Sequence, residues 1–508
     1  MESIFYHLLN GFATALTGDN LFAATAGAVM GMFIGALPGI GSVMGVALLL
    51  PLTFKMDPTT AIIMLAALYY STMYAGSFTA ILINIPGDPP ALMTTLDGYQ
   101  LTLKGKAGKA LAVSNWSSFV AGFIGVIILT FMGPLLADIG LAFGPAEMTT
   151  VILLALSAIA WLLGDDPLKG LLSTCLGILL ATVGLDAAVG RPRFAFGIIE
   201  LLNGIDFIPL VIGLLGVNEI IEMALQKGGY KFKTTETLSF RSNYLNFAEI
   251  KQIFKPTMIS SVLGTFIGCI PGAGTNTASF LCYVLESRTG NNKENMGKGA
   301  LEGVAAPEAA NNAAAAGAFA PLLALGIPSS GTVTVLLGGL MMWGITPGPL
   351  LFTEHPDLAW GLIASMYTGN IVCMIIAALS IPLMVQALRV PPVIMTPIII
   401  VICMVSAYAA NNSLFDVWLM IIFGIVGYFF CRYKYPVAPF LMAFILTPRL
   451  EMSARQAFDI SNGDPAIFLQ KPIALAFLTA TLFFFIASVA LKFCKMCRIK
   501  LKRPSDHC

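Results

Sequence analysis

One glycine- and proline-rich motif occurs twice in this chain. Residues 31–41 read GMFIGALPGIG and residues 264–274 read GTFIGCIPGAG, with seven of eleven positions identical. Further matching segments follow in the same order in both halves: 75–86 with 316–328, and 145–149 with 392–396. Self-similarity at a nearly constant offset indicates repeated structural units. The sequence therefore predicts two repeats, at 20–226 and 256–448.

The hydrophobic composition places these repeats in a lipid bilayer. Of the 508 residues, 57% are hydrophobic and only 11% are charged, whereas a soluble domain carries roughly 25% charged residues. A spanning helix needs about 20 apolar residues, so the chain has room for about 10 to 12 spans. We therefore expect an all-α polytopic membrane protein. This composition excludes a soluble enzyme and an intrinsically disordered chain.

The repeats and the polar stretches between them divide the chain into consecutive segments. We expect an N-terminal segment at 1–19, membrane repeat 1 at 20–226, a cytoplasmic linker at 227–255, membrane repeat 2 at 256–448, an external loop at 449–471, and a C-terminal helix with a basic cytoplasmic tail at 472–508. The last segment has no counterpart in either repeat.

The placement of lysine and arginine predicts how the repeats are oriented. The tail at 492–503 holds six basic residues, which places the C-terminus in the cytoplasm. Counting spans back from the tail puts the loop at 286–300 in the cytoplasm, so the second hairpin opens to that side. The basic cluster at 104–109 follows only after the second motif of the first repeat, so the first hairpin opens outside. The repeats are therefore predicted to be inverted, with four exceptions to the charge pattern: Arg191, Arg193, Arg449 and Arg455.

The Pro-Gly segments predict breaks in membrane helices. Unpaired backbone groups are costly in lipid, so such breaks persist only where they are buried in protein or line a wet cavity. One isolated break is explained by close packing or a kink, but matched breaks in inverted repeats are typical of secondary transporters. Helix N-termini at the breaks favour an anionic substrate. Each repeat is expected to hold a re-entrant helical hairpin and a broken helix.

The candidate substrate-binding residues are the small and polar residues at these breaks. They are Pro38, Gly39, Gly41, Ser42 and Asn84 in the first repeat, and Pro271, Gly272, Gly274, Thr275, Asn276, Thr277, Ser329, Ser330 and Thr332 in the second. Unwound backbone and neutral oxygens near a helix break are suited to a desolvated Na⁺ ion. A candidate Na⁺ site therefore lies near the side chains with such oxygens: Thr275, Asn276, Ser329 and Ser330.

A second polar group interrupts an alanine-rich stretch. Glu308 falls on the same helical face as Asn311 and Asn312, and ionisable groups inside membranes are costly and usually functional. Three roles are open to this group: a proton relay, a coupling-ion site, or a structural hydrogen-bond cluster. A proton carrier needs a titratable group in the path, and Glu308 is the candidate. We expect Na⁺ as the coupling ion, with H⁺ as the alternative, and no other cofactor.

Several chemistries are missing from the sequence. It has no G-x-x-x-x-G-K-[ST] phosphate loop and no G-x-S-x-G nucleophile elbow. Its three histidines, His7, His355 and His507, lie near ends or loops. We therefore expect neither an enzyme nor a nucleic-acid-binding protein. Without a nucleotide site, uphill transport by this chain needs an ion gradient.

The motifs taken together resemble the large membrane subunit of the bacterial tripartite tricarboxylate transporter family. The matching segments extend over nearly the whole chain: 35–39 (GALPG), 74–87 (YAGSFTAILINIPG), 96–99 (LDGY), 105–111 (GKAGKAL), 270–274 (IPGAG), 302–313 (EGVAAPEAANNA), 325–328 (LGIP) and 344–349 (GITPGP). The resemblance implies a multi-pass protein of the bacterial inner membrane. It also implies two partners, a periplasmic solute-binding protein and a small four-helix membrane subunit; a homo-oligomer is left open.

The expected function combines the breaks with this resemblance. We expect the permease subunit of a binding-protein-dependent secondary transporter that imports a di- or tricarboxylate, such as citrate, with a cation gradient. One alternative is a passive carboxylate channel of similar build. The other is a membrane scaffold subunit without a transport pathway of its own.

Overall fold

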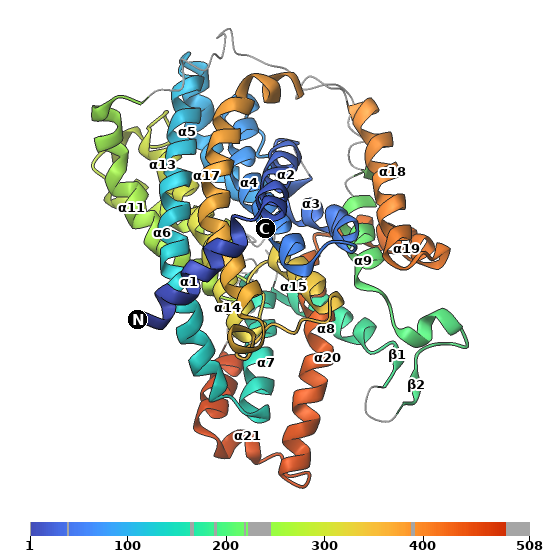
Figure 1. Cartoon of the computed structure of the whole chain (residues 1–508). Coiled ribbons are helices and arrows are strands. Elements are labelled where there is room, and N and C mark those ends of the chain that lie inside the picture. The colour runs from blue at the N-terminus through green and yellow to red at the C-terminus, as the bar shows by residue number, and fades with distance from the viewer. Residues whose placement is uncertain are drawn as a thin grey trace, which may run out of the picture. The chain divides into compact units, whose positions relative to one another are not determined.

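The computed structural model describes residues 2–37, 40–162, 167–186, 190–217, 220–221, 245–387 and 392–483. Two candidate site residues, Pro38 and Gly39, lie outside these ranges, as do most of the predicted linker and the basic C-terminal tail. Nearly all regular structure in the described ranges is helical (Figure 1), which confirms the all-α prediction.

The helices have the lengths expected of a multi-pass membrane protein. Shorter apolar helices of 10–17 residues, such as Gly331–Met342, accompany the long ones. Five helices in the described part are long and apolar enough to cross a bilayer: Pro58–Ile83, Ala107–Leu141, Pro356–Ile381, Leu414–Arg432 and Val437–Ile460.

The first half of the chain begins with α1 (Glu2–Ala15), α2 (Gly18–Gly35), α3 (Gly41–Leu49), η1 (Leu50–Thr53), α4 (Pro58–Ile83), η2 (Pro89–Ala91), α5 (Leu92–Leu103) and α6 (Ala107–Leu141). It continues with α7 (Pro145–Leu162), α8 (Pro167–Ala181), β1 (Gly184–Leu185), β2 (Pro192–Arg193), η3 (Ile199–Asn203), α9 (Phe207–Val211) and the π-helix η4 (Ile212–Val217). β1 and β2 pair antiparallel, with Gly184 opposite Arg193.

The second half contains α11 (Phe247–Cys269), α12 (Gly274–Thr289), η6 (Lys293–Asn295), α13 (Glu302–Gly317), α14 (Phe319–Leu325), α15 (Gly331–Met342) and α16 (Leu351–Glu354). It ends with α17 (Pro356–Ala387), α18 (Pro392–Asn411), α19 (Leu414–Arg432), α20 (Val437–Ile460) and α21 (Ile467–Gln470). A further helix covers Pro472–Phe483, where the C-terminal helix is expected.

Both halves contain the same order of elements. Two packed helices on either side of the Pro-Gly segment come first, α2 with α3 and α11 with α12. A helix that stops at a break follows: α4 ends at Asn84 and α14 at Gly326, with φ of 62° and 65°. Helical structure resumes at η2 and at α15, and the long helices α6 and α17 come after. The predicted breaks are therefore present in both halves.

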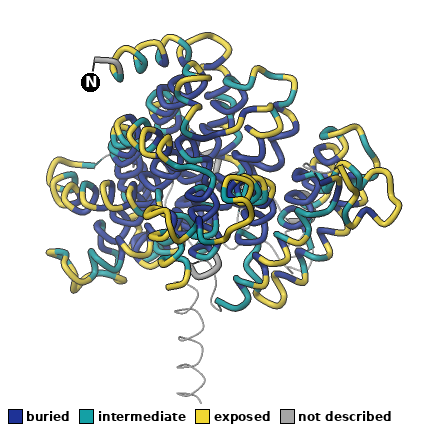
Figure 2. The backbone as a smooth tube through the Cα atoms, turned by 90° about the horizontal axis from the view of Figure 1, so that it is seen from below, coloured by how far each residue is buried: buried dark blue, intermediate teal, exposed yellow. Residues whose placement is uncertain are grey.

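Glycines let the first helix of each pair pack directly on the backbone of the helix that leads to the break. That helix is α4 in the first half and α13, which continues into α14, in the second half. A side-chain carbon at Gly31 in α2 would collide with Leu68 in α4, and one at Gly268 in α11 would collide with Ala314 in α13. Buried residues run along nearly the whole of α4 and α13. Figure 2 shows buried residues, in dark blue, through the interior of the molecule and exposed ones, in yellow, at its margins. These two helices and their glycine contacts form the core that holds the breaks in place.

The chain divides into two compact units, and each unit takes segments from both halves. In one unit, η4 of the first half packs on α18 and on α19, where Gly213 faces Met420. In the other, α20 of the second half packs on α7 and α8, where Gly177 faces Phe440. In each unit, a helix of one half therefore packs on a helix pair of the other half. The units comprise 1–140 with 207–428, and 141–206 with 429–508.

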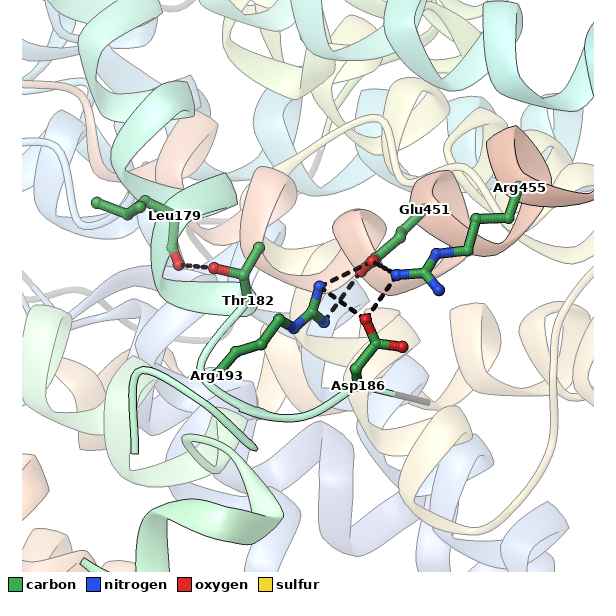
Figure 3. A network of polar contacts seen from close by, with 6 residues as sticks. All are labelled: Leu179, Thr182, Asp186, Arg193, Glu451 and Arg455. Carbon is green, nitrogen blue, oxygen red and sulfur yellow. Dashed lines mark hydrogen bonds and ion pairs between the residues drawn. The ribbon is translucent and has the colours of Figure 1, made fainter. Parts of the chain in front are cut away.

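An ion-pair network joins the β1–β2 region to α20 within the second of these units (Figure 3). Arg193 on β2 donates to the two carboxylate oxygens of Glu451 at 2.8 and 3.2 Å. Arg455 lies 2.6 Å from both Asp186 and Glu451. Two of the four arginines that violate the predicted charge pattern, Arg193 and Arg455, are thus neutralised by carboxylates in the folded protein.

Candidate functional site

The tip of the first helix pair contacts the breaks of both halves. Gly41 begins α3 with a φ of 61°, and the N–H of Ser42 donates to Asp88 Oδ2 at 2.9 Å. The hydroxyl of Ser42 lies 2.9 Å from that of Thr332 in the first turn of α15. The side chains of Ser42, Asp88 and Thr332 are buried. Three residues that are far apart in the sequence therefore meet at one point.

The tip of the second helix pair contacts the break of its own half. The N–H of Gly272 donates to the carbonyl of Ser329 at 3.1 Å. Gly274 begins α12 with a φ of 56° and faces Ser330, which is the N-cap of α15. Thr275 is buried beside it. The structure therefore brings together five of the predicted site residues of the second half.

The four remaining candidates within the described residues lie at the breaks but take no part in these contacts. Asn84 is exposed and takes the left-handed conformation that asparagine tolerates better than most residues, so it shapes the break. Asn276 is exposed on α12, while Pro271 and Thr277 are half-buried. The buried set at the tips does not include these four side chains.

Three helix N-termini meet at the tips. α3 begins at Gly41, α12 at Gly274 and α15 at Gly331. The Ser42–Thr332 hydrogen bond joins α3 to α15, and the contact of Gly274 with Ser330 joins α12 to α15. The first N–H groups of a helix lack intrahelical partners, and the helix dipole adds positive potential there. The arrangement can therefore bind an anionic group such as a carboxylate.

Two buried hydroxyls at this place have no hydrogen-bond partner in the described part of the chain, Ser329 Oγ and Tyr69 OH. Tyr69 comes from α4 and is 1% exposed. The side chains of Ser330, Thr275 and Asp88 are its polar neighbours. Buried polar groups are nearly always paired with protein or water. Orphan hydroxyls beside helix N-termini are typical of a site that a polar ligand completes.

The sequence pattern did not single out Asp88 or Tyr69. Asp88 is 4% exposed, and no lysine or arginine contacts it among the described residues. The available signal was its position in a Pro-Gly-Asp-Pro-Pro break, because an acid inside a membrane segment is costly unless it has a function. The neutral oxygens predicted to bind a cation thus have a carboxylate near them.

Glu308 lies in a second polar cluster that is fully buried. The hydroxyls of Thr94 in α5 and Ser114 in α6 donate to its carboxylate, the latter at 3.4 Å. The Nδ2 of Asn311 donates to it at 3.3 Å. Both polar side-chain atoms of Asn312 lack a partner within the described ranges. The structure therefore joins Glu308 to Asn311, as predicted from helical spacing, and every partner described for this carboxylate is neutral.

Basic residues of both halves meet at the start of α6. Lys104 donates to the carbonyl of Lys298 at 2.5 Å, and Lys109 pairs with Glu249 near the start of α11.

Asp97 in α5 is fully buried and fixes the loop before α13. It accepts hydrogen bonds from the N–H groups of Gly297, Gly299 and Ala300 and from the hydroxyl of Tyr283.

These features define a multi-pass membrane protein whose broken helices meet at a buried polar site. The chain belongs to the tripartite tricarboxylate transporter TctA family, which it matches over residues 21–442. This confirms the family predicted from the motifs. The chain is accordingly a component of a tripartite tricarboxylate transporter, and the tripartite organisation implies partner subunits.

Two relatives from Agrobacterium vitis are themselves uncharacterized. The 52.8 kDa protein of the TAR-I ttuC' 3' region is 39% identical over 482 residues, which cover 95% of each chain. The protein of the TAR-II ttuC' 3' region is 42% identical over 215 residues, which cover 42% of this chain and 89% of that one. No solved structure matches the chain.

Proposed function

We propose that the chain is the permease subunit of a binding-protein-dependent secondary transporter that imports a di- or tricarboxylate. One observation carries the proposal: three helix N-termini and two unpartnered buried hydroxyls meet where the breaks of both halves touch. A carboxylate can take several N–H donors at such a place without a buried basic side chain. Membership of a tricarboxylate transporter family supports this substrate class.

Co-transport of a cation completes the proposal. A multiply charged anion is costly to move through a low-dielectric interior, and a bound cation reduces that cost. Neutral hydroxyl oxygens where the two tips meet support Na⁺ as the cation, with H⁺ as the alternative. The buried Glu308 is the candidate proton carrier if H⁺ couples.

The proposal includes an inverted arrangement of the two repeats. The long helices α6 and α17 run antiparallel, since Gly122 faces Asn370 and Gly133 faces Phe352, just before α17. The start and the end of α6 can therefore be used to compare the directions in which the two hairpins open.

The two hairpins open toward opposite ends of α6. At the open end of the first, Thr60 donates to Asn20, and Thr59 lies near Gly361 at the start of α17. At the open end of the second, Glu249 pairs with Lys109 at the start of α6. This geometry supports inverted repeats with re-entrant hairpins. The family and the basic residues at 492–503 support their placement in a bacterial inner membrane with the C-terminus in the cytoplasm.

Reconstitution tests the proposed function. The chain is purified with the small membrane subunit and placed in proteoliposomes, the solute-binding protein is added outside, and uptake of radiolabelled citrate and succinate is measured. An inward Na⁺ gradient is expected to accumulate one of these carboxylates above its external concentration, and a sodium ionophore is expected to stop this. Replacement of Na⁺ by choline under an inward H⁺ gradient distinguishes the two ions.

The same measurement decides between the proposal and its alternatives. Flux that only equilibrates the carboxylate across the membrane identifies a passive channel. A complete absence of flux with both partners present identifies a scaffold subunit.

A further inference from the structure

The breaks of the two halves differ at one corresponding position. Asn84 and Gly326 end the broken helices with nearly the same left-handed conformation, with φ of 62° and 65°. The residue four positions further on occupies the N-cap position of the next helical segment in each half: Asp88 precedes η2, and Ser330 precedes α15. Asp88 and Ser330 therefore occupy equivalent places in the two breaks.

The two residues also have the same relation to the hairpin tips. A Cβ atom at Gly41 would lie 3.3 Å from Asp88 Oδ1, and one at Gly274 would lie 3.4 Å from the Cβ of Ser330. Both glycines have positive φ and begin the second arm of their hairpin. The geometry is thus duplicated, but the charge is not: one position is a carboxylate and the other a neutral hydroxyl.

The surroundings leave this carboxylate without a counter-charge. One oxygen, Asp88 Oδ2, accepts the N–H of Ser42, and none of the ion pairs among the described residues involves Asp88. The hydroxyls of Ser42 and Thr332 bond to each other next to it, and the Tyr69 hydroxyl nearby has no partner in the described ranges. An uncompensated buried charge is strongly unfavourable, so a bound cation fits this place better than an empty site does.

We propose that Asp88 binds the coupling cation, while Ser330 and the N-termini of α12 and α15 hold a carboxylate of the substrate. The inference rests on the proposed function and assigns separate ligands to the two halves of its site. The ligand of Asp88 is a monovalent cation: Na⁺, or H⁺ if Asp88 rather than Glu308 carries the proton. Before this cation binds, the Asp88 charge repels the substrate anion; after it binds, the repulsion is gone. Cation and carboxylate binding are thereby coupled, and the coupling is reciprocal.

The Asp88→Asn variant separates this role from a structural one. The amide oxygen of asparagine can still accept the Ser42 N–H, so the tip contact is preserved, but the charge is removed. The variant is expected to lose gradient-driven accumulation of citrate in the reconstituted complex and to retain citrate–citrate exchange. Its binding of citrate is expected to become independent of Na⁺ and of pH, whereas the wild-type complex binds citrate about 10-fold more tightly with its cation present.

Matched variants complete the design. Asp88→Ser makes the position equal to Ser330 and is expected to behave as Asp88→Asn does, which keeps the test valid if the asparagine variant is poorly folded. Ser330→Ala is expected to weaken citrate binding and leave its cation dependence unchanged. Asp138→Asn, which changes an exposed carboxylate on α6, is expected to match the wild type.

Dependence of wild-type citrate binding on Na⁺ at fixed pH identifies Na⁺ as the cation, and dependence on pH in choline identifies H⁺.

Two results overturn the inference. One is accumulation by both Asp88 variants with the cation requirement of the wild type. The other is carboxylate binding by these variants that still responds to the cation as in the wild type. If the wild-type complex itself accumulates no carboxylate, the proposed function fails instead, so the two failures are distinguishable.

Discussion

Gly41, at the tip of the first helix pair, has a left-handed backbone conformation and also lies close to a carboxylate. Its φ of 61° is unfavourable for residues with a side chain, and a Cβ atom there would lie 3.3 Å from Asp88 Oδ1. Gly105 separates these properties, because its φ is 69° but nothing lies within 4 Å of its Cβ position. An alanine at either position carries a backbone cost of about 1–2 kcal/mol. At Gly41, but not at Gly105, the alanine side chain also displaces the Asp88 carboxylate.

Gly41→Ala is therefore expected to reduce uptake and to raise the cation concentration needed for the half-maximal rate. Gly105→Ala is expected to lower thermal stability by a similar amount and to leave this cation requirement unchanged. Uptake kinetics and thermal unfolding of both purified variants check the prediction. Equal cation requirements in the two variants would reduce Gly41 to a turn residue.

The residues of the site could be predicted only where a local signal marks them. Ser42, Thr275 and Ser330 follow glycine or proline at a helix break, so their neighbourhood was visible in the sequence. Tyr69 lies in the middle of the apolar helix α4, away from the break, and only the packing of α4 brings its hydroxyl to the tips. Asp88 lies within a break, but an aspartate beside proline is also an ordinary turn residue, so its role was ambiguous.

At the level of the helices, glycine contacts determine how closely the helix pairs α2–α3 and α11–α12 approach the helices that lead to the breaks. A Cβ atom at Gly268 in α11 would collide with the backbone of Ala314 in α13. Gly369 in α17 has no atom within 4 Å of its Cβ position. Overpacking a buried contact costs about 1–3 kcal/mol, whereas alanine in an unobstructed helix position gains up to about 1 kcal/mol over glycine.

Gly268→Ala is therefore expected to lower the midpoint of thermal unfolding in detergent by several degrees, and Gly369→Ala to leave it unchanged or raise it. Tryptophan fluorescence or size-exclusion chromatography after heating measures both. A Gly268→Ala protein as stable as the wild type would show that α11 and α13 can separate at no cost.

The elements themselves were predictable to different degrees. The helix breaks were expected because glycine, proline and their duplication are local features of the sequence. The packing of helices of one half on those of the other, with α20 on α7 and α8 and with η4 on α18, was not expected. It depends on contacts between distant segments, which hydrophobic periodicity does not encode. The short β1–β2 pair depends in the same way on the distant residues Glu451 and Arg455.

Across the whole molecule, contacts between loops predict which loops lie on the same side of the membrane. Lys104 contacts Lys298, so the loops of the two halves at this end belong to one side. The other end of α6 lies against the segment before α17, where Gly140 faces Pro349. His355 follows in that segment.

Single cysteines at positions 104 and 293 are therefore expected to be protected from an impermeant thiol reagent in intact cells, and one at 355 is expected to react. Labelling is measured before and after permeabilisation, with the unsubstituted chain as the control for its own cysteines. Reaction at 293 together with protection at 355 would reverse the orientation, and different behaviour at 104 and 293 would contradict the inverted arrangement.

The central claim is that the breaks of the two halves meet at a site through which the substrate passes. The hydroxyl oxygens of Ser42 and Thr332 are 2.9 Å apart across this junction, so cysteines at the two positions fall within reach of a disulfide. In the Ser42→Cys/Thr332→Cys protein, mild oxidation is predicted to form this bond, detected by mass spectrometry, and to stop carboxylate uptake until a reductant is added. Variants that carry only Ser42→Cys or only Thr332→Cys are predicted to keep their carboxylate uptake after oxidation. Failure of the bond to form, or full uptake by the cross-linked protein, would contradict the account.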